Sequence, residues 1–161
     1  MFNLKAEFYL KIIFLFSFIA LISAFFIEYI LGYQPCNLCL IERIPYISSI
    51  IIITSIFLIK KNQKFLVMLL ILTFIFSFAI SFYHYGIEQG FFQESSVCGV
   101  KSLTEIITKE DLLKQLSEKT ISCKDVTFRI FGLSLTSINI VISLLFIITL
   151  LKIFKKYEKN K

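Results

Sequence analysis

Four long apolar runs limit what this chain can fold into more than any other feature of its sequence. They cover residues 12–30, 45–59, 65–85 and 133–151. A helix needs about 20 apolar residues to cross the roughly 30 Å hydrocarbon core of a bilayer, and in lipid a helix satisfies its own backbone hydrogen bonds. The second run is the shortest, and residues 40–44 can lengthen it. We therefore predict an all-α membrane protein, built as a bundle of four transmembrane helices.

The composition supports a single membrane domain. The chain has 161 residues, of which 57% are hydrophobic, whereas soluble domains contain about 45–50% apolar residues. The four runs and their connections use nearly all of residues 1–161, so no separate soluble domain is expected. A cleaved signal peptide over residues 1–30 is the weaker interpretation, because the first run is longer than the roughly 7–15 apolar residues of a signal peptide core.

The distribution of charge predicts the orientation in the membrane. Although the net charge is +6, the basic residues lie in short clusters beside the apolar runs, which indicates the lipid bilayer and no nucleic acid as partner. Lysines gather in residues 1–11, 60–64 and 152–161, whereas residues 86–131 hold six basic and seven acidic residues. By the positive-inside rule both termini should be cytoplasmic. The connections 31–44 and 86–131 then form two outer loops.

All four cysteines fall in these two outer loops. Disulfides persist outside the reducing cytosol, and the spacing suggests the pairs Cys36–Cys39 and Cys98–Cys123. A Cys-x-x-Cys pair is more typical of redox chemistry than of a structural bridge, although purely structural disulfides are an alternative. Four thiolates, or three with His84, could also bind zinc. We expect no metal, because zinc ribbons show two Cys-x-x-Cys pairs and here 24 residues separate the second pair.

Arg43 lies four residues beyond Cys39, at the membrane boundary. If the second helix begins near Cys39, the two side chains share a face. Pro45 disfavours helical geometry at Ile44, so a start close to Pro45 is the alternative. Such an arginine can merely reach lipid headgroups. Beside a Cys-x-x-Cys pair, we favour a role in stabilising an anion or a polarised carbonyl, since cationic groups also lower the pKa of a thiol.

Two further features occur at the outer side. His84, the single histidine, is a functional candidate because ionisable groups near the membrane are costly, but it can also be only a hydrogen-bonded boundary residue; Glu28 is interpreted as interfacial. In the second outer loop, Ser102–Glu105 and Thr108–Asp111 resemble capping boxes. They predict short amphipathic helices on the bilayer surface, within a loop that either moves as a thiol shuttle or is only braced by a disulfide.

The sequence GYQPCNLCLIER, the single histidine, the second cysteine pair and FGLSL before the last run together resemble the disulfide bond formation protein B (DsbB) family. The most specific part is Pro-Cys-x-x-Cys-x-x-x-Arg, and the resemblance covers nearly the whole chain. It implies a protein-disulfide oxidoreductase of the bacterial inner membrane. Such an enzyme reoxidises a periplasmic DsbA-type thioredoxin-fold protein and passes the electrons to the membrane quinone pool, through ubiquinone or menaquinone.

The resemblance also implies roles for the cysteines. Cys98 would be the sulfur that the partner thiolate attacks. Cys123 would then attack the Cys36–Cys39 disulfide. Cys36 would exchange with the second pair, and Cys39 would face the quinone.

For the other two candidates, the resemblance implies that Arg43 holds the quinone carbonyl and stabilises negative charge on the ring. His84 would lie near the same pocket. A non-enzymatic membrane scaffold with structural disulfides is the alternative function. A transmembrane carrier of reductant is disfavoured, because it needs cysteines accessible from both sides and no cysteine lies within or on the inner side of the predicted spans.

Overall fold

The computed structural model describes residues 4–59, 62–94, 98, 122–124, 129–130 and 132–159. Its elements in chain order are α1 (Leu4–Tyr29), α2 (Asn37–Ile41), α3 (Ile44–Leu58), α4 (Gln63–Glu88), β1 (Arg129–Ile130), β2 (Leu133–Ser134) and α6 (Leu135–Lys159). Four stretches are long and apolar enough to cross a membrane, namely Ala6–Tyr29, Asn37–Leu58, Gln63–Glu88 and Leu135–Lys156. The predicted fold class is confirmed, since the described chain is mostly helical and has four stretches long and apolar enough to span a membrane.

The observed helices begin and end at different residues from the predicted runs. α1 begins at Leu4 instead of residue 12. Its first turns are too polar to count as part of the apolar run, but they are helical and contain an ion pair one turn apart, between Lys11 and Glu7 at 3.2 Å. Residues 133–134 do not open the last helix. They form β2, which pairs antiparallel with β1 across a turn where Gly132 has a φ of 82°, a conformation that glycine adopts without strain.

The second spanning stretch consists of two helices. α2 covers five residues, the chain turns at Glu42 and Arg43, and α3 begins at Ile44 with Pro45 in its first turn. Proline is well accommodated there because its missing N–H has no helical partner to lose. Both predicted starting points therefore occur, and together α2 and α3 give a spanning stretch of 22 residues.

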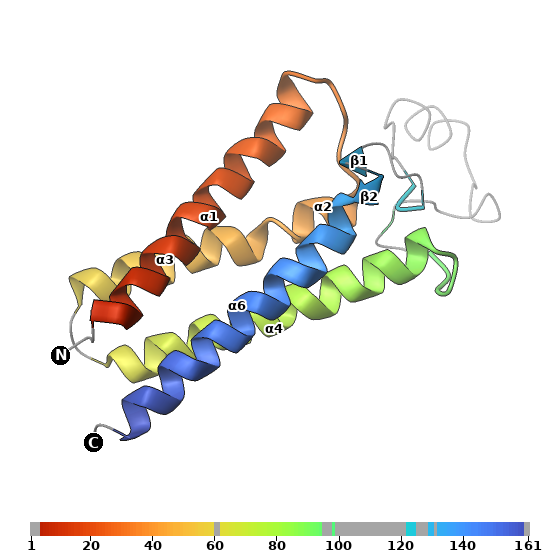
Figure 1. The fold of residues 1–161 in the computed structure, drawn as a ribbon. Helices are drawn as coiled ribbons and strands as arrows, with labels where there is room; N and C mark the ends of the chain where they lie inside the picture. The colour runs from red at the N-terminus through yellow and green to blue at the C-terminus, as the bar shows by residue number, and fades with distance from the viewer. Residues whose placement is uncertain are drawn as a thin grey trace, which may run out of the picture.

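The helices place the two termini at one end of the bundle and the cysteines at the other. In Figure 1, the N- and C-termini lie at the same end of the bundle as the last turn of α3 and the first turn of α4. α2 and the β1–β2 hairpin lie at the opposite end. The predicted amphipathic helices of the second outer loop, including Ser102–Glu105 and Thr108–Asp111, fall outside the described residues.

The core forms where α1, α3, α4 and α6 pack together. Its most buried side chains are Leu10, Ile13, Ile53, Ile56, Val67, Leu70, Phe74 and Leu150. Pairs of serines join the helices within this core: Ser49 Oγ donates to Ser17 Oγ at 2.9 Å, and Ser143 Oγ donates to Ser77 Oγ at 3.1 Å. Small hydroxyl residues allow helices in a membrane to approach closely while keeping their polar atoms paired.

We predict that Phe74→Ala strongly destabilises the bundle. The side chain is 0% exposed, and its ring meets that of Phe146 edge to face at 5.0 Å. Removing a buried aromatic ring leaves a cavity that costs about 3 kcal/mol or more of the free energy of unfolding. Denaturation of the detergent-solubilised protein measures this loss. Phe76→Ala is the matched control, because Phe76 on the same helix is 51% exposed; equal losses for both variants would contradict the proposed core.

Candidate functional site

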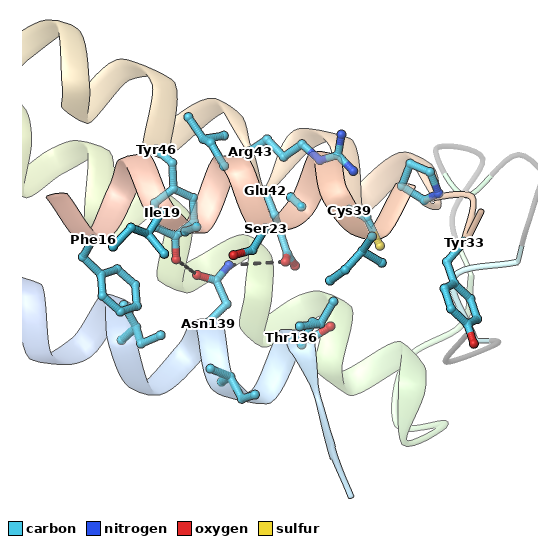
Figure 2. A pocket seen from close by; sticks show the side chains of 18 of the residues that line it. Phe16, Ile19, Ser23, Tyr33, Cys39, Glu42, Arg43, Tyr46, Thr136 and Asn139 are labelled. Carbon is cyan, nitrogen blue, oxygen red and sulfur yellow. Dashed lines mark hydrogen bonds between the residues drawn. The ribbon is translucent and has the colours of Figure 1, made fainter. Parts of the chain in front are cut away.

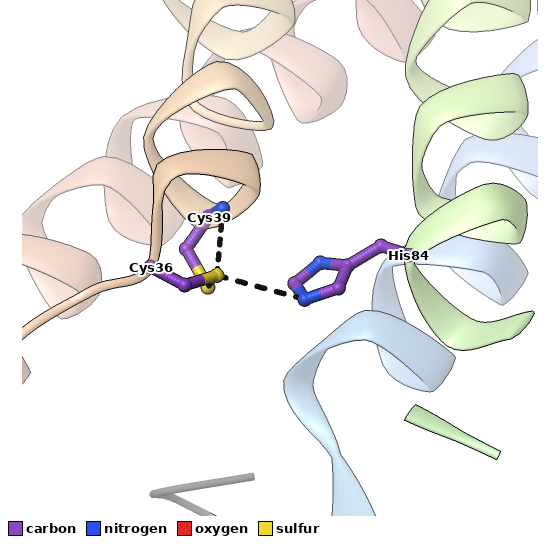
Figure 3. A group of neighbouring side chains, drawn as sticks. All are labelled: Cys36, Cys39 and His84. Atoms are coloured by element: carbon purple, nitrogen blue, oxygen red, sulfur yellow. Dashed lines mark hydrogen bonds between the residues drawn. The ribbon is translucent and has the colours of Figure 1, made fainter. Parts of the chain in front are cut away.

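The short helix α2 brings the first two cysteines together. Cys36 is the N-cap residue, with extended backbone angles (φ −72°, ψ 167°), so its side chain folds back over the first turn. Its Sγ accepts a hydrogen bond from the N–H of Cys39 at 3.2 Å, and the two sulfurs lie 2.6 Å apart. Both are free thiols, and Figure 3 shows them beside His84. This dithiol is positioned to close into a disulfide, because its sulfurs already lie well inside van der Waals contact.

His84 approaches the dithiol from α4. Its Nε2 lies 3.6 Å from Cys36 Sγ, and its Nδ1 lies 2.9 Å from Oε1 of Glu42. A carboxylate can only accept a hydrogen bond, so the Nδ1–H donates to Glu42 and Nε2 faces the sulfur. Glu88 lies near the same nitrogen as the sulfur, with Oε1 4.0 Å from Nε2. The arrangement is a buried thiol, imidazole and carboxylate in series.

These neighbours alter the acidity of Cys36. The hydrogen bond from the Cys39 thiol, and after it the contact with His84, lower the pKa of the Cys36 thiol from 9.0 to about 5, although burial alone would raise it. At neutral pH the reduced pair therefore carries its negative charge on Cys36. Arg43 does not contribute to the lowered pKa of Cys36, and its guanidinium instead pairs with Glu28.

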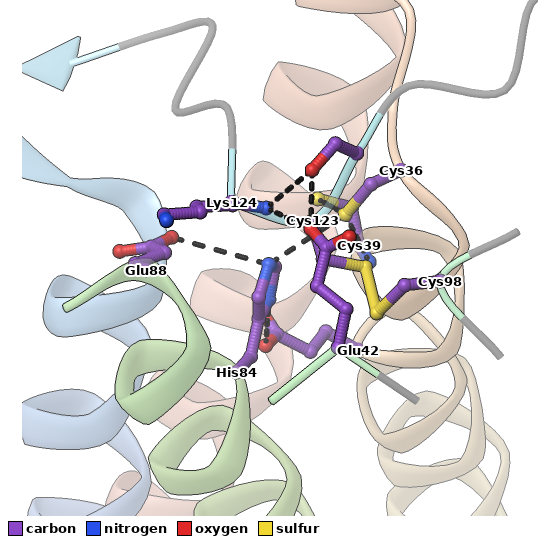
Figure 4. Close-up of a disulfide and its surroundings, with 10 residues drawn as sticks. Cys36, Cys39, Glu42, His84, Glu88, Cys98, Cys123 and Lys124 are labelled. Atoms are coloured by element: carbon purple, nitrogen blue, oxygen red, sulfur yellow. Dashed lines mark hydrogen bonds and ion pairs between the residues drawn. A yellow bond between two sulfur atoms is a disulfide. The ribbon is translucent and has the colours of Figure 1, made fainter. Parts of the chain in front are cut away.

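The second cysteine pair lies beside the first. Cys98 and Cys123 form a disulfide with their Cα atoms 5.6 Å apart, the pairing that their spacing suggested. Both are buried in one apolar cluster that also contains Cys36 and Ile87, and Figure 4 shows the four cysteines around the same point. The backbone near Cys123 is held by a hydrogen bond from the N–H of Lys124 to a Glu94 carboxylate oxygen at 2.9 Å.

A cavity of about 340 Å³ lies on the other side of the dithiol, between α1, α3 and α6. This volume falls within the roughly 300–1,000 Å³ of small-molecule sites. Figure 2 shows its polar wall. The polar or ionisable residues that line it include Tyr33, Gln34, Cys39, Glu42, Arg43, Tyr46, Thr136 and Asn139, and the rest of its lining is mostly apolar. Among the described residues that line it, neither Cys36 nor His84 occurs. Cys39 is therefore the sulfur that faces the cavity.

Arg43 lines the cavity with one side of its guanidinium engaged. Its Nη1 donates to Oε2 of Glu28 at 2.5 Å, and its guanidinium carbon lies 5.2 Å from the ring centre of Phe25. The buried Nε has no hydrogen-bond acceptor among the described residues. A buried donor left unpaired costs about 1–3 kcal/mol, so an acceptor atom of a bound ligand would be stabilising here. Glu28, interpreted from the sequence as interfacial, is thus the partner of Arg43.

Glu42 and Asn139 are site residues that the sequence interpretation missed. Oε2 of Glu42 accepts a hydrogen bond from Asn139 Nδ2 at 3.3 Å, and the same Nδ2 donates to Ser81 Oγ at 2.7 Å. The hydroxyl of Tyr46 donates to Asn139 Oδ1. The available signal is the rule that ionisable and strongly polar residues within a membrane span are functional candidates, and Glu42 and Asn139 both satisfy it.

Three donor atoms are close enough together to suggest a metal. Sγ of Cys36, Sγ of Cys39 and a ring nitrogen of His84 all lie within 4.8 Å of one another. Two thiolates bound to one tetrahedral zinc ion, each about 2.3 Å from it, would lie about 3.8 Å apart. The observed sulfur separation of 2.6 Å fits a dithiol poised to oxidise and does not fit two ligands of one zinc ion.

Two comparisons with known proteins cover most of the chain. The family model described as "Disulfide bond formation protein DsbB" matches residues 6–153, a range that includes every cysteine. The chain is also similar to a protein of Rickettsia prowazekii (strain Madrid E), named Uncharacterized protein RP370. The two are 32% identical over 147 residues, which span 90% of this chain and 86% of that protein.

We predict that Cys36 of the reduced protein reacts with alkylating agents far below the usual pH. A lowered pKa means that the thiolate persists until the pH falls through about 5, instead of through the ordinary value of 9.0. The rate of iodoacetamide labelling, followed by mass spectrometry of the Cys36 peptide between pH 4 and pH 10, measures the midpoint. Cys39→Ala should raise it by removing the thiol donor. A midpoint near 9 in the unaltered protein would contradict the described contacts.

Proposed function

Because the chain belongs to the DsbB family of disulfide bond formation proteins, we propose that it is a quinone-dependent thiol oxidase. It takes electrons from a periplasmic DsbA-type thioredoxin-fold protein and passes them to ubiquinone or menaquinone in the membrane. One observation carries the proposal: the Cys36–Cys39 dithiol lies between a second disulfide on one side and a ligand-sized cavity on the other.

The disulfide side accounts for the exchange of thiols. A thiolate of the partner attacks Cys98, which breaks the Cys98–Cys123 disulfide and releases Cys123 as a thiolate. Cys123 then attacks Cys36, which forms a Cys36–Cys123 disulfide, breaks the Cys36–Cys39 bond and releases Cys39 as a thiolate. The second thiolate of the partner displaces Cys98, and Cys98 attacks Cys123, which re-forms the Cys98–Cys123 disulfide and leaves Cys36 reduced. Exchange needs direct contact between sulfurs. The burial of Cys36, Cys98 and Cys123 in one cluster supports this route.

The cavity side accounts for the acceptor. Its mostly apolar lining suits a quinone ring, and the unpaired Nε of Arg43 provides a donor for a carbonyl oxygen. When bound, a quinone supplies the capacity to accept two electrons and two protons. Cys39 faces the cavity and is the sulfur from which the electrons leave. The positive charge of Arg43 stabilises negative charge that develops beside it. His84 contacts Cys36 and is not among the described residues that line the cavity, so its proposed role is toward Cys36 and not toward the quinone.

The proposed orientation puts both termini in the cytoplasm of a bacterial cell and both cysteine pairs on the periplasmic face of the inner membrane. It is supported by the lysines near the termini and in residues 60–64. It is also supported by the position of the termini at the end of the bundle opposite α2 (Figure 1), the helix that contains Cys39 and has Cys36 as its N-cap. In this orientation the dithiol exchanges with secreted partners while the cavity remains within the span of the membrane.

We predict that the purified protein reduces a quinone when it receives a reduced DsbA-type donor. The loss of quinone absorbance and the thiol content of the donor are followed together. Cys39→Ser should abolish quinone reduction, because only one sulfur of the first pair then remains. Ser143→Ala is the control for an altered buried polar contact between helices and should retain the activity. A donor that stays reduced with the unaltered protein, or full activity of Cys39→Ser, would support a structural scaffold instead.

We predict that Arg43→His weakens the apparent affinity for quinone and leaves thiol exchange intact. Losing a charge-assisted hydrogen bond worth about 1.5–3 kcal/mol should raise the KM for quinone about tenfold or more. Exchange between the donor and the Cys98–Cys123 disulfide, measured by rapid mixing without quinone, should keep its rate. Lys155→His is the control for a change of lysine or arginine to histidine away from the site, because Lys155 is exposed near the C-terminal end of α6. An unchanged KM would remove Arg43 from the quinone site.

A further inference from the structure

Glu42 connects the two sides of the dithiol. It lines the cavity together with Cys39, and its Oε1 lies 2.9 Å from Nδ1 of His84. The other ring nitrogen of His84 lies 3.6 Å from Cys36 Sγ. Cys36 itself does not line the cavity among the described residues. The imidazole and the carboxylate therefore form a continuous series of polar groups from the buried sulfur to the cavity.

The charge of Glu42 is not neutralised by the neighbouring arginine. Arg43 pairs with Glu28 of α1 at 2.5 Å, so within the described part of the chain the ion-pair partner of Glu42 is His84. The side chains of His84 and Glu42 are only 3% and 12% exposed, and bulk water is largely excluded. Among the described residues, the ionisable and charged groups around Glu42 come from four helices and their caps. They are Cys36 at the N-cap of α2, Cys39 within α2, Arg43 at the N-cap of α3, Tyr46 of α3, His84 and Glu88 of α4, and Glu28 of α1 through Arg43.

Oxidation of the dithiol releases protons, and the series of polar groups formed by His84 and Glu42 can carry one of them to the cavity. Oxidation of the Cys36–Cys39 dithiol to a disulfide releases two electrons and two protons, and a quinone consumes both electrons and both protons. The proton of Cys39 is released beside the cavity. The proton that Cys36 gives up as its thiolate forms is on the opposite side of α2, where His84 Nε2 is 3.6 Å from the sulfur, in a buried region where an unpaired charge would be costly once oxidation removes the thiolate. It requires a path of groups that can accept and donate protons.

We propose that His84 and Glu42 relay the proton of Cys36 into the cavity, an inference that rests on the proposed quinone reduction. The thiol proton passes from Sγ to Nε2 of His84 as the Cys36 thiolate forms, and when oxidation removes the thiolate the proton on Nδ1 passes to Oε1 of Glu42. The protonated carboxyl group then delivers it into the cavity, and a flip of the imidazole ring restores the starting tautomer. Asn139 Nδ2, 3.3 Å from Oε2, holds the carboxylate in place, so Asn139 is a positioning residue.

Glu42→Gln tests the relay in the full-length protein. Glutamine keeps the size and can still accept the hydrogen bond from Nδ1, but it cannot take up the proton. We expect the kcat for quinone reduction to fall about 100-fold, as for the loss of a general acid–base group, with the KM for quinone changed less than about twofold. Glu42→Asp should recover part of the kcat, and Ser143→Ala should behave as the unaltered protein. A raised KM with an unchanged kcat would overturn the relay by making Glu42 only a binding residue.

A second measurement needs neither quinone nor turnover. In the reduced, quinone-free protein, removing the carboxylate charge should weaken the support that His84 gives to the Cys36 thiolate. The pH midpoint of Cys36 alkylation should then rise by about one unit in Glu42→Gln. A midpoint that does not move would overturn the relay. Failure of the unaltered protein to reduce any quinone would instead overturn the proposed function, and the alkylation midpoint would still report on the link between Glu42 and Cys36.

Discussion

Lipid offers no hydrogen-bond partner to a peptide group, and the architecture of this protein follows from that constraint. Each apolar run satisfies its backbone by forming a helix. Four helical stretches long enough to span a membrane return the chain to the end of the bundle where it began, so α2, which follows α1, and the β1–β2 hairpin, which precedes α6, lie at a common end (Figure 1). Cys36 and Cys39 lie at the start of α2, and Cys98 and Cys123 lie in the same apolar cluster. The two cysteine pairs can therefore meet because an even number of spanning stretches brings the chain back to the same end of the bundle. Local contacts then determine how the sulfurs lie relative to one another.

The turn at residues 42–43 determines how the dithiol relates to the rest of the site. If α2 and α3 formed one straight helix, the side-chain directions of Glu42 and Arg43 would be fixed by the regular geometry of that helix. The interruption lets Glu42 reach His84 of α4 while Arg43 reaches Glu28 of α1. Two adjacent residues of opposite charge thus pair with different helices. Their charges are separated instead of cancelling, which leaves a cation at the cavity and an anion next to the imidazole.

The sequence predicted the helices well because their signal is local. Apolar runs and flanking lysines identify spans without any knowledge of packing, and the cysteine motif marks the dithiol. The strand β2 was missed because its pairing with β1 depends on the turn at Gly132. The Arg43–Glu28, His84–Glu42 and Asn139–Glu42 contacts span 15, 42 and 97 residues. One sequence does not reveal which polar groups meet across helices, so Glu42 and Asn139 emerged only from the structure.

The single turn of α2 separates the faces of the dithiol, with Cys36 directed to the second disulfide and Cys39 to the cavity. In the proposed reaction, the protein donor and the membrane acceptor approach from opposite sides and never compete for the same space. The enzyme can release its oxidised donor before the acceptor arrives, and the reducing equivalents wait on the sulfur pair in between. Such a division favours double-displacement kinetics, in which each half-reaction is saturated by its own substrate.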